Sequence, residues 1–325
     1  MLNDRCVDGG IFFPRDIPGL SRDRIISMGK LRTNACIAGL YNLLSDSAIT
    51  EWDLDFSVGR QPVRFRSLDR KTMLLEGWHN PEGRLSYLTK FLADRISPDS
   101  RPGFWLRVAA DISVLGTGIC SLLAQGAIDW AHPVDISVIS GDFSAPLSGW
   151  YLQSMGFPVG KIICCCNENQ AVWELIHLGQ LRTEGVCTRT GTPEADILIP
   201  AGLEVMIAHY GSAQDIADFS QCLQDGSAYI PSEQIVNQLR NHLFVSVVSE
   251  SRMRFTIAGI MQRCFFPISP YGALCYAGAQ DYRTKRVENN LTMVFSEKSP
   301  KLDRDTVSSA LGISSAALEK ILNRM

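Results

Sequence analysis

A short glycine-containing loop in the middle of the chain has residue types suited to holding a ligand. It follows an apolar run at 136–139 and consists of Gly141, Asp142, Phe143 and Ser144. The residues after it, at 148–158, have apolar side chains at helical spacing and end in a Gly-Phe-Pro stop. Backbone N–H groups of such a loop and the N-terminus of the next helix face one point, where they bind anionic groups. The loop therefore predicts a small-ligand site at the carboxyl end of a strand.

The elements that position this loop form a βαβ unit. A second apolar run at 161–166 predicts a strand, which an Asn-Glu-Asn turn at 167–169 closes. Further strands are expected at 73–78, at the start of 244–263 and at 291–296. Helices are expected at 28–45, 86–96, 104–130, 202–210, 214–224 and 269–283, and in the tail after Asp303.

This order of elements predicts an α/β fold with a mostly parallel sheet flanked by helices. We expect the sheet to be built from about residues 104–300. The linker-like composition at 96–103 divides the chain into an N-terminal α+β lobe, residues 1–100, and an α/β core with C-terminal capping helices, residues 101–325.

The composition is that of an ordinary globular protein and does not indicate binding to nucleic acid or to a membrane. The chain has 325 residues, of which 46% are hydrophobic and 20% are charged, and its formal net charge is −3. This charge gives no basic field for nucleic acid or a membrane surface. No apolar run approaches the roughly 20 residues of a membrane-spanning helix, and no signal peptide is visible. The 10 cysteines are expected to be free thiols in a cytoplasmic protein.

Three of these cysteines, Cys164, Cys165 and Cys166, are adjacent in a predicted strand. Neighbouring strand residues point to opposite faces of a sheet, so the three thiols cannot converge on one metal ion. We expect them to pack in the core, and no other His or Cys spacing indicates a metal site.

The loop, the helix and the second strand together resemble one enzyme family. The segments are Gly141–Ser144, SGWYLQSMGFP at 148–158 and the Asn-Glu-Asn-Gln turn at 167–170. They are similar to the Gly-Asn-Phe-Gly phosphate loop, the following helix and the Asn-Glu-Asn-Asp turn of the threonine synthases, which use pyridoxal phosphate. DGGIFFPRDIPGLS at 8–21, SPYGALCYAGAQDY at 269–282 and LTMVFSEKSPKL at 291–302 also resemble that family.

The resemblance implies the larger domain of fold-type-II pyridoxal-phosphate enzymes, with the smaller domain largely deleted. It also implies pyridoxal phosphate as the cofactor and O-phosphohomoserine as the ancestral substrate. A face once covered by the lost domain is expected to be buried by self-association, because large apolar patches on monomers are rare.

The lysine that the family uses to form a Schiff base with the cofactor is absent from its motif. Its slot falls on Leu85 or Ser86, whereas His79 matches a family position near the cofactor. An internal Schiff base requires a primary amine, which neither residue has. Lys90 lies about one helical turn further on and is the alternative amine. VLGTGICS at 114–121 is either a remnant of the family's carboxylate-binding loop or a helix with a Gly-Thr-Gly break.

Other positions of the family's cofactor site are altered here. Asp142 replaces a neutral Asn and Ser144 replaces the second Gly of the phosphate loop. Ser296 falls where the family places a hydroxyl opposite the pyridine nitrogen. Lys298 and Lys301 follow Ser296, with Glu297 between, and are expected in a solvated, charged loop.

These features leave three functional hypotheses open. The first is a threonine-synthase-like protein without lyase activity, which binds a small anion or an amino acid, or regulates a true enzyme. The second is a repurposed enzyme whose acid–base groups would be Asp142, Ser144, Ser296, His79 and Glu82. The third is a working threonine synthase with a displaced lysine such as Lys90.

Overall fold

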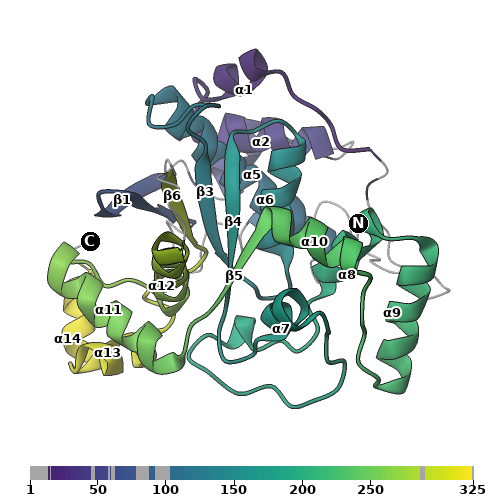
Figure 1. Cartoon of the computed structure of the whole chain (residues 1–325). Helices are drawn as coiled ribbons and strands as arrows, with labels where there is room; N and C mark the ends of the chain where they lie inside the picture. The colour runs from purple at the N-terminus through teal and green to yellow at the C-terminus, as the bar shows by residue number, and fades with distance from the viewer. Residues whose placement is uncertain are drawn as a thin grey trace.

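The fold is seen in a computed structural model, which describes residues 14, 16–44, 48–57, 59, 63–77, 88–91, 103–285 and 290–323. Its centre is a six-stranded sheet in the order β1-β2-β6-β3-β4-β5 (Figure 1). The strands are β1 (Arg64–Asp69), β2 (Thr72–Glu76), β3 (Val134–Ile139), β4 (Val159–Cys166), β5 (Leu243–Val247) and β6 (Leu291–Ser296). Among the described strands, the pair of β1 and β2 is antiparallel and the other pairs are parallel. The predicted α/β fold with a mostly parallel sheet is confirmed.

The sheet begins earlier in the chain than the sequence indicates. The hairpin of β1 and β2 pairs through β2 with β6, in register from Thr72 opposite Thr292 to Glu76 opposite Ser296. The strand β1 was not expected, and the N-terminal hairpin extends the same sheet as the core strands. The linker expected at 96–103 lies outside the described residues except for Gly103.

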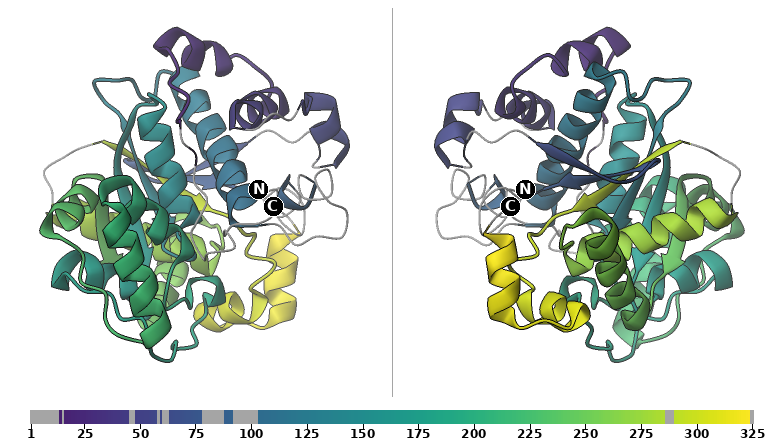
Figure 2. Two further views of the ribbon diagram at one scale, coloured as in Figure 1. Left: turned by 90° about the vertical axis from the view of Figure 1, so that its right-hand side faces the viewer. Right: turned by 90° about the vertical axis from the view of Figure 1, so that its left-hand side faces the viewer.

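Helices cover both faces of the sheet. One layer contains α2 (Thr33–Leu44), α5 (Phe104–Ala124) and α6 (Ser144–Ser154), which pack on one another. The other layer contains α11 (Glu250–Cys264), α12 (Pro270–Lys285), α13 (Arg304–Leu311) and α14 (Ser315–Leu322). In Figure 2 the yellow helices α13 and α14 lie at the opposite end of the molecule from the purple N-terminal helices.

The remaining helices pack on the α2, α5 and α6 layer, on one another or on the strands β4 and β5. They are α1 (Arg22–Met28), α3 (Glu51–Ser57), α7 (Ala171–Leu178), η1 (Pro193–Ala195), α8 (Ala201–Tyr210), α9 (Ala213–Asp225) and α10 (Glu233–His242). The predicted helices at 202–210 and 214–224 correspond to α8 and α9, whereas α10 was not expected. α10 ends at His242 and β5 begins at Leu243, with no turn residues between them. The polar helix and the apolar strand therefore show no boundary in the sequence.

The strand of three cysteines shows how the sheet separates two cores. Ile162, Cys164 and Cys166 belong to the larger buried cluster, under α5 and α6. Ile163 and Cys165 belong to the second cluster, with α11 and α12. The alternation predicted from strand geometry is confirmed. Every cysteine among the described residues is a free thiol.

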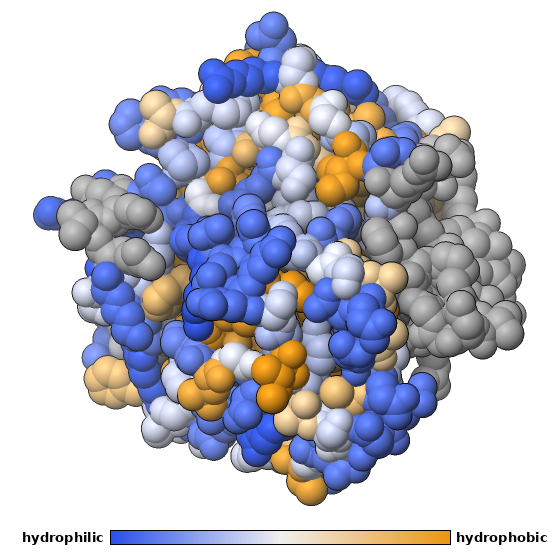
Figure 3. Space-filling model, turned by 45° about the vertical axis from the view of Figure 1, so that its right-hand side comes forward, coloured by the Kyte–Doolittle hydropathy of each residue, from blue (hydrophilic) through white to orange (hydrophobic). Residues whose placement is uncertain are grey.

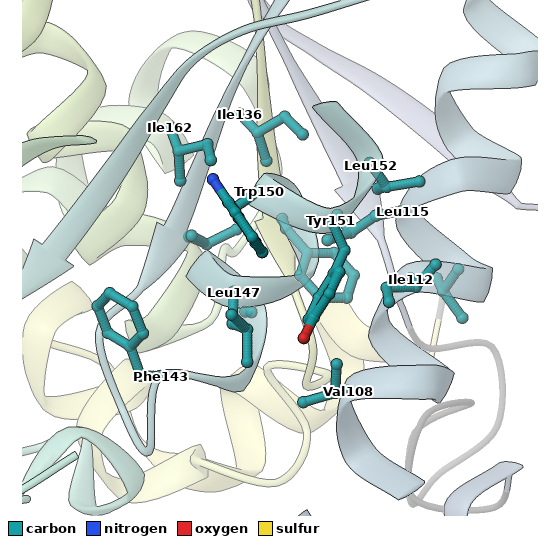
Figure 4. Close-up of a cluster of buried hydrophobic side chains, with 14 of the residues drawn as sticks. Val108, Ile112, Leu115, Ile136, Phe143, Leu147, Trp150, Tyr151, Leu152 and Ile162 are labelled. Carbon is teal, nitrogen blue, oxygen red and sulfur yellow. The ribbon is translucent and has the colours of Figure 1, made fainter. Parts of the chain in front are cut away.

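α5 is the central helix of the larger core. Of the described helices it alone is long and apolar enough to cross a membrane, but 83% of its apolar window is buried inside the protein. Tyr151 of α6 lies beside Val108 and Ile112 of α5 in the buried cluster of Figure 4, which also contains Leu147 and Trp150 of α6. The segment 114–121 is continuous helix, so the helical reading of VLGTGICS is confirmed and the loop reading is wrong.

Exposed apolar side chains are dispersed on the surface. On the face shown in Figure 3, hydrophobic residues form small separate groups between hydrophilic ones. Trp52 and Phe56 of α3 and Phe255 of α11 are 62%, 96% and 78% exposed. Self-association through a large apolar face stays a prediction.

Phe265, which ends α11, has an unfavourable backbone conformation. Its φ is 53° and its ψ is 35°, in the left-handed region, and its side chain is 83% exposed. This conformation costs an L-residue roughly 1–2 kcal/mol, whereas glycine adopts it freely. We expect Phe265→Gly to raise the free energy of unfolding by about 1 kcal/mol in urea denaturation.

Phe255→Gly is the matched control, because Phe255 is exposed within the same helix. Glycine in an ordinary helical position costs about 0.5 kcal/mol relative to Phe, so this variant should be less stable than the wild-type chain. A loss of stability in both variants would contradict the assignment of strain to Phe265.

Candidate functional site

The predicted glycine loop borders a cavity of about 420 Å³ at the carboxyl ends of β3 and β6. The walls are the first turns of α5, the loop and the start of α6, the segment around η1 and the residues after β6. Six charged side chains line it: Arg107, Asp111, Asp142, Glu194, Glu297 and Lys298. A cavity of this size holds a small molecule.

The backbone of the loop is sharply turned. Gly141 has a φ of +42° and Phe143 a φ of +72°. The N–H of Phe143 donates to the carbonyl of Ser140 at 2.7 Å, which closes the turn into α6. The side chain of Phe143 is fully buried beside Leu147 in the cluster of Figure 4. Gly141, Asp142 and Ser144 thus line the cavity, whereas Phe143 packs in the core.

The carboxylate of Asp142 accepts hydrogen bonds from the first N–H of α6 and from Arg107. Its Oδ1 accepts the N–H of Ser144, at the start of α6, at 3.0 Å. Its Oδ2 accepts Nε and Nη2 of Arg107 at 2.8 and 2.7 Å. A helix N-terminus beside an arginine is the arrangement that binds phosphate. Here a side chain of the loop itself takes that place, so the residues present do not fit the phosphate of pyridoxal phosphate.

The position of the loop is fixed from its other side by α8. The N–H of Gly202 donates to the carbonyl of Asp142 at 2.9 Å. A Cβ at Gly202 would lie 2.6 Å from the ring of Phe104 and 3.1 Å from Phe143. A side chain at position 202 would therefore clash with these two residues, so glycine is needed there. The hydrogen bond from Gly202 fixes the backbone of Asp142.

Asp111 presents a second carboxyl group to the cavity from α5. The residue is 4% exposed, and burial raises the pKa of its carboxyl to about 8. The hydroxyl of Ser144 and the charge of Arg107 lower this pKa, and the charge of Asp142 raises it. Arg107 itself is bonded to Asp142, so Asp111 has no ion-pair partner in the described part of the chain.

Glu297 and Lys298 lie in the cavity wall. Burial raises the pKa of Glu297 well above its usual range, and the nearby charges of Asp111, Glu194 and Asp142 act in the same direction. Lys298 forms an ion pair with Glu194, and its Nζ lies 5.3 Å from the ring centre of Tyr271. The expectation of a solvated, charged loop at these residues is therefore wrong, because β6 ends directly at the cavity.

The Asn-Glu-Asn turn after β4 holds the opposite wall. Asn167 donates to the carboxylate of Asp196 at 2.7 Å and to the hydroxyl of Thr190 at 2.9 Å. Asn169 donates to Asp196 at 3.0 Å and to the carbonyl of Thr188 at 2.8 Å. These bonds tie residues 188–196 to the sheet, and this segment carries Glu194 into the cavity wall. The turn resembling the family motif therefore positions a wall of the site.

The other residues expected at the site lie apart from it or outside the described residues. Ser296 is 1% exposed, and its hydroxyl shares a hydrogen bond with Ser269 at 2.8 Å and donates to the carbonyl of Lys298 at 3.1 Å. It does not line the cavity. Lys90 is exposed, beside the cavity-lining Thr89, and is itself not part of the lining. His79, Glu82, Leu85 and Ser86 lie outside the described residues.

No group of three His, Cys, Asp or Glu side chains placed to hold a metal ion occurs within the described ranges.

A mostly parallel sheet with helices on both faces, and a glycine loop opening a helix at the carboxyl end of a strand, define the class: the fold of the fold-type-II pyridoxal-phosphate enzymes. Pyridoxal-phosphate-bound threonine synthase from Brucella melitensis superposes with a TM-score of 0.79 at 16% identity, covering 99% of this chain and 90% of that one. Yeast threonine synthase gives 0.80 at 16% identity, covering 98% and 90%. The chain thus has the fold of the threonine synthases, and the predicted resemblance to that family is confirmed.

The sequence comparisons agree over part of the chain. "Threonine synthase-like 1" from Homo sapiens is 32% identical over 102 residues, which are 31% of this chain and 14% of that protein. Threonine synthase from Methylobacillus glycogenes is 32% identical over 95 residues, or 29% of this chain and 19% of that protein. The matched segments therefore span less than a fifth of these relatives. No protein-family model matches the chain.

Proposed function

We propose that this threonine-synthase-like protein binds a small molecule in the cavity beside Asp142 and does not catalyse a pyridoxal-phosphate-dependent lyase reaction. The observation that supports this most directly is the carboxylate of Asp142 on the N–H of Ser144 and on Arg107. A phosphate at this place would meet a like charge and find its donors already bonded. The same argument disfavours a small anion as the ligand.

The lysines support the same proposal. The family's lysine slot falls on Leu85 or Ser86, which have no amine. Lys90 is exposed and outside the cavity lining. A lysine that attacks a carbonyl group must have a free amine, and Lys298 is held in an ion pair with Glu194.

Addition of pyridoxal phosphate to the purified chain tests the proposal. A covalent adduct with a lysine absorbs at about 410–430 nm and is fixed to the protein by borohydride. We expect no stable absorbance in this range beyond that of free cofactor, and no labelled peptide after proteolysis. A single labelled lysine at near-stoichiometric yield would overturn the proposal, and inorganic phosphate binding at micromolar concentration would count against it equally.

One observation favours a second candidate function. Lys298 is an amine within the cavity lining, although it comes from the end of β6 and not from the family's lysine position. It could hold a carbonyl-bearing molecule covalently if it were released from Glu194. The peptide map of the borohydride experiment distinguishes the two candidate functions. Labelling at Lys298 that is lost in Lys298→Met would support the second one.

A further inference from the structure

The charges of the cavity do not balance within the described residues. Arg107 is bonded to Asp142, and Lys298 is paired with Glu194, so both cations of the lining have a carboxylate partner. Two more carboxyl groups, Asp111 and Glu297, line the same cavity. A ligand that enters this cavity therefore meets two carboxyl groups to which the described lining offers no ion-pair partner.

Asp111 is the group that points to a ligand. It is 96% buried and lines the cavity, and the described residues provide it with one hydrogen-bonding neighbour, the hydroxyl of Ser144. An ionised carboxylate buried without a cation is strongly disfavoured, so such groups are paired or hold a proton. The cavity of about 420 Å³ lies beside this carboxyl group, so the cationic group of a ligand can be its ion-pair partner.

We propose that the cavity binds a small aliphatic amine whose ammonium groups are held by the carboxylates of Asp111 and Glu297. This inference rests on the proposed function, since it requires Asp142 and not a ligand phosphate on the glycine loop. With both carboxylates ionised the six charged groups of the lining sum to −2, which a diamine neutralises. A zwitterionic amino acid would bring a carboxylate, and both cations of the described lining already have a carboxylate partner.

Proton exchange gives the proposal a second signature. Arg107 and Ser144 lower the pKa of Asp111 while Asp142 raises it, and Asp142, Glu194 and Asp111 raise the pKa of Glu297 while Lys298 lowers it. Burial is the largest cause for both groups, and with a pKa of about 8 the carboxyl of Asp111 carries a proton in the empty cavity at neutral pH. An ammonium group must displace the proton of Asp111, so affinity rises with pH, by about tenfold per unit below the pKa of that carboxyl.

The experiment is titration calorimetry of the full chain with putrescine, using butanediol as the neutral analogue of similar size. We expect putrescine to bind and butanediol not to bind, with putrescine affinity rising about tenfold or more between pH 6 and pH 7. Buffers of different ionisation enthalpy should report proton release. Asp111→Asn and Glu297→Gln should each lower the affinity at least about 30-fold, because each leaves an ammonium group without its partner.

Glu233→Gln is the matched control, since Glu233 is an exposed carboxylate on α10. It should bind putrescine like the wild-type chain. The proposal fails if putrescine does not bind, if its affinity falls with pH, or if both cavity variants bind as well as the control. Tighter binding of magnesium chloride than of putrescine would also overturn it. A separate titration of the wild-type chain with phosphate tests the proposed function. Phosphate binding would contradict the proposed function, whereas a failure to bind putrescine without phosphate binding would contradict only the amine proposal.

Discussion

An Asp142→Asn variant is expected to bind inorganic phosphate about 1000-fold more tightly than the wild-type chain. A carboxylate about 4 Å from a phosphate charge disfavours binding by about 4 kcal/mol at an effective dielectric constant near 20. The substitution removes this charge and releases Arg107, which Asp142 now holds at 2.8 Å. The amide oxygen of Asn still accepts the N–H of Ser144, so the start of α6 remains capped.

Titration calorimetry with phosphate measures this gain. Asp305→Asn is the control, because Asp305 is an exposed carboxylate in the first turn of α13 and its loss changes the net charge equally. The control should bind phosphate as weakly as the wild-type chain. Equal phosphate affinities for all three proteins would show that the Asp142 carboxylate does not prevent phosphate from binding at the loop.

An Asp111→Asn variant is expected to be about 4 kcal/mol more stable than the wild-type chain at pH 7. The pKa of Asp111 rises from 3.8 to about 8 on folding, so the folded protein keeps a proton that the unfolded chain loses. Between about pH 4 and pH 8, unfolding therefore releases this proton, and raising the pH favours the unfolded state. The stabilisation linked to the proton is complete below pH 4 and lost as the pH rises through about 8.

Urea denaturation across this range measures the effect. The difference in stability between Asp111→Asn and wild type should be near zero at about pH 4, grow with pH and level off above about pH 8. Asp218→Asn, at an exposed position of α9, should show no such growth. A difference that is flat with pH, or that shrinks as pH rises, would mean that Asp111 is ionised in the folded protein.

The fold could be predicted from local patterns. The runs at 136–139 and 161–166, with a glycine loop and a helix between them, correspond to β3, α6 and β4 within a few residues. Period-two geometry also placed Cys164 and Cys165 on opposite faces of the sheet. β1 was missed because Arg64, Arg66 and Asp69 alternate with few apolar residues, and the strand is stabilised by its antiparallel partner.

The site was predicted only in part. Gly141, Asp142 and Ser144 line the cavity as loop residues, but Arg107 and Asp111 were not considered. These two are the only charged residues of α5, and they stand four positions apart on one face of an otherwise apolar helix. That spacing was the available signal. Their true partners, across the cavity on the loop, depend on tertiary packing that no local pattern encodes.

Glu194 and Lys298 were missed for a related reason. Each is a charged residue in an irregular segment, and in sequence such residues resemble solvent-exposed loops. They lie in the cavity because β6 ends there and because Asp196 anchors the segment before α8. Long-range hydrogen bonds from Asn167, 29 positions away along the chain, determine this placement.

The bonds from Asn167 and Asn169 to Asp196 also affect how the cavity receives a molecule. Because residues 188–196 are already tethered, an arriving guest does not have to immobilise that stretch of backbone. Ordering a loose segment on association would subtract from the affinity. The entropic penalty of complex formation should therefore come mainly from the guest itself and from the few side chains it touches.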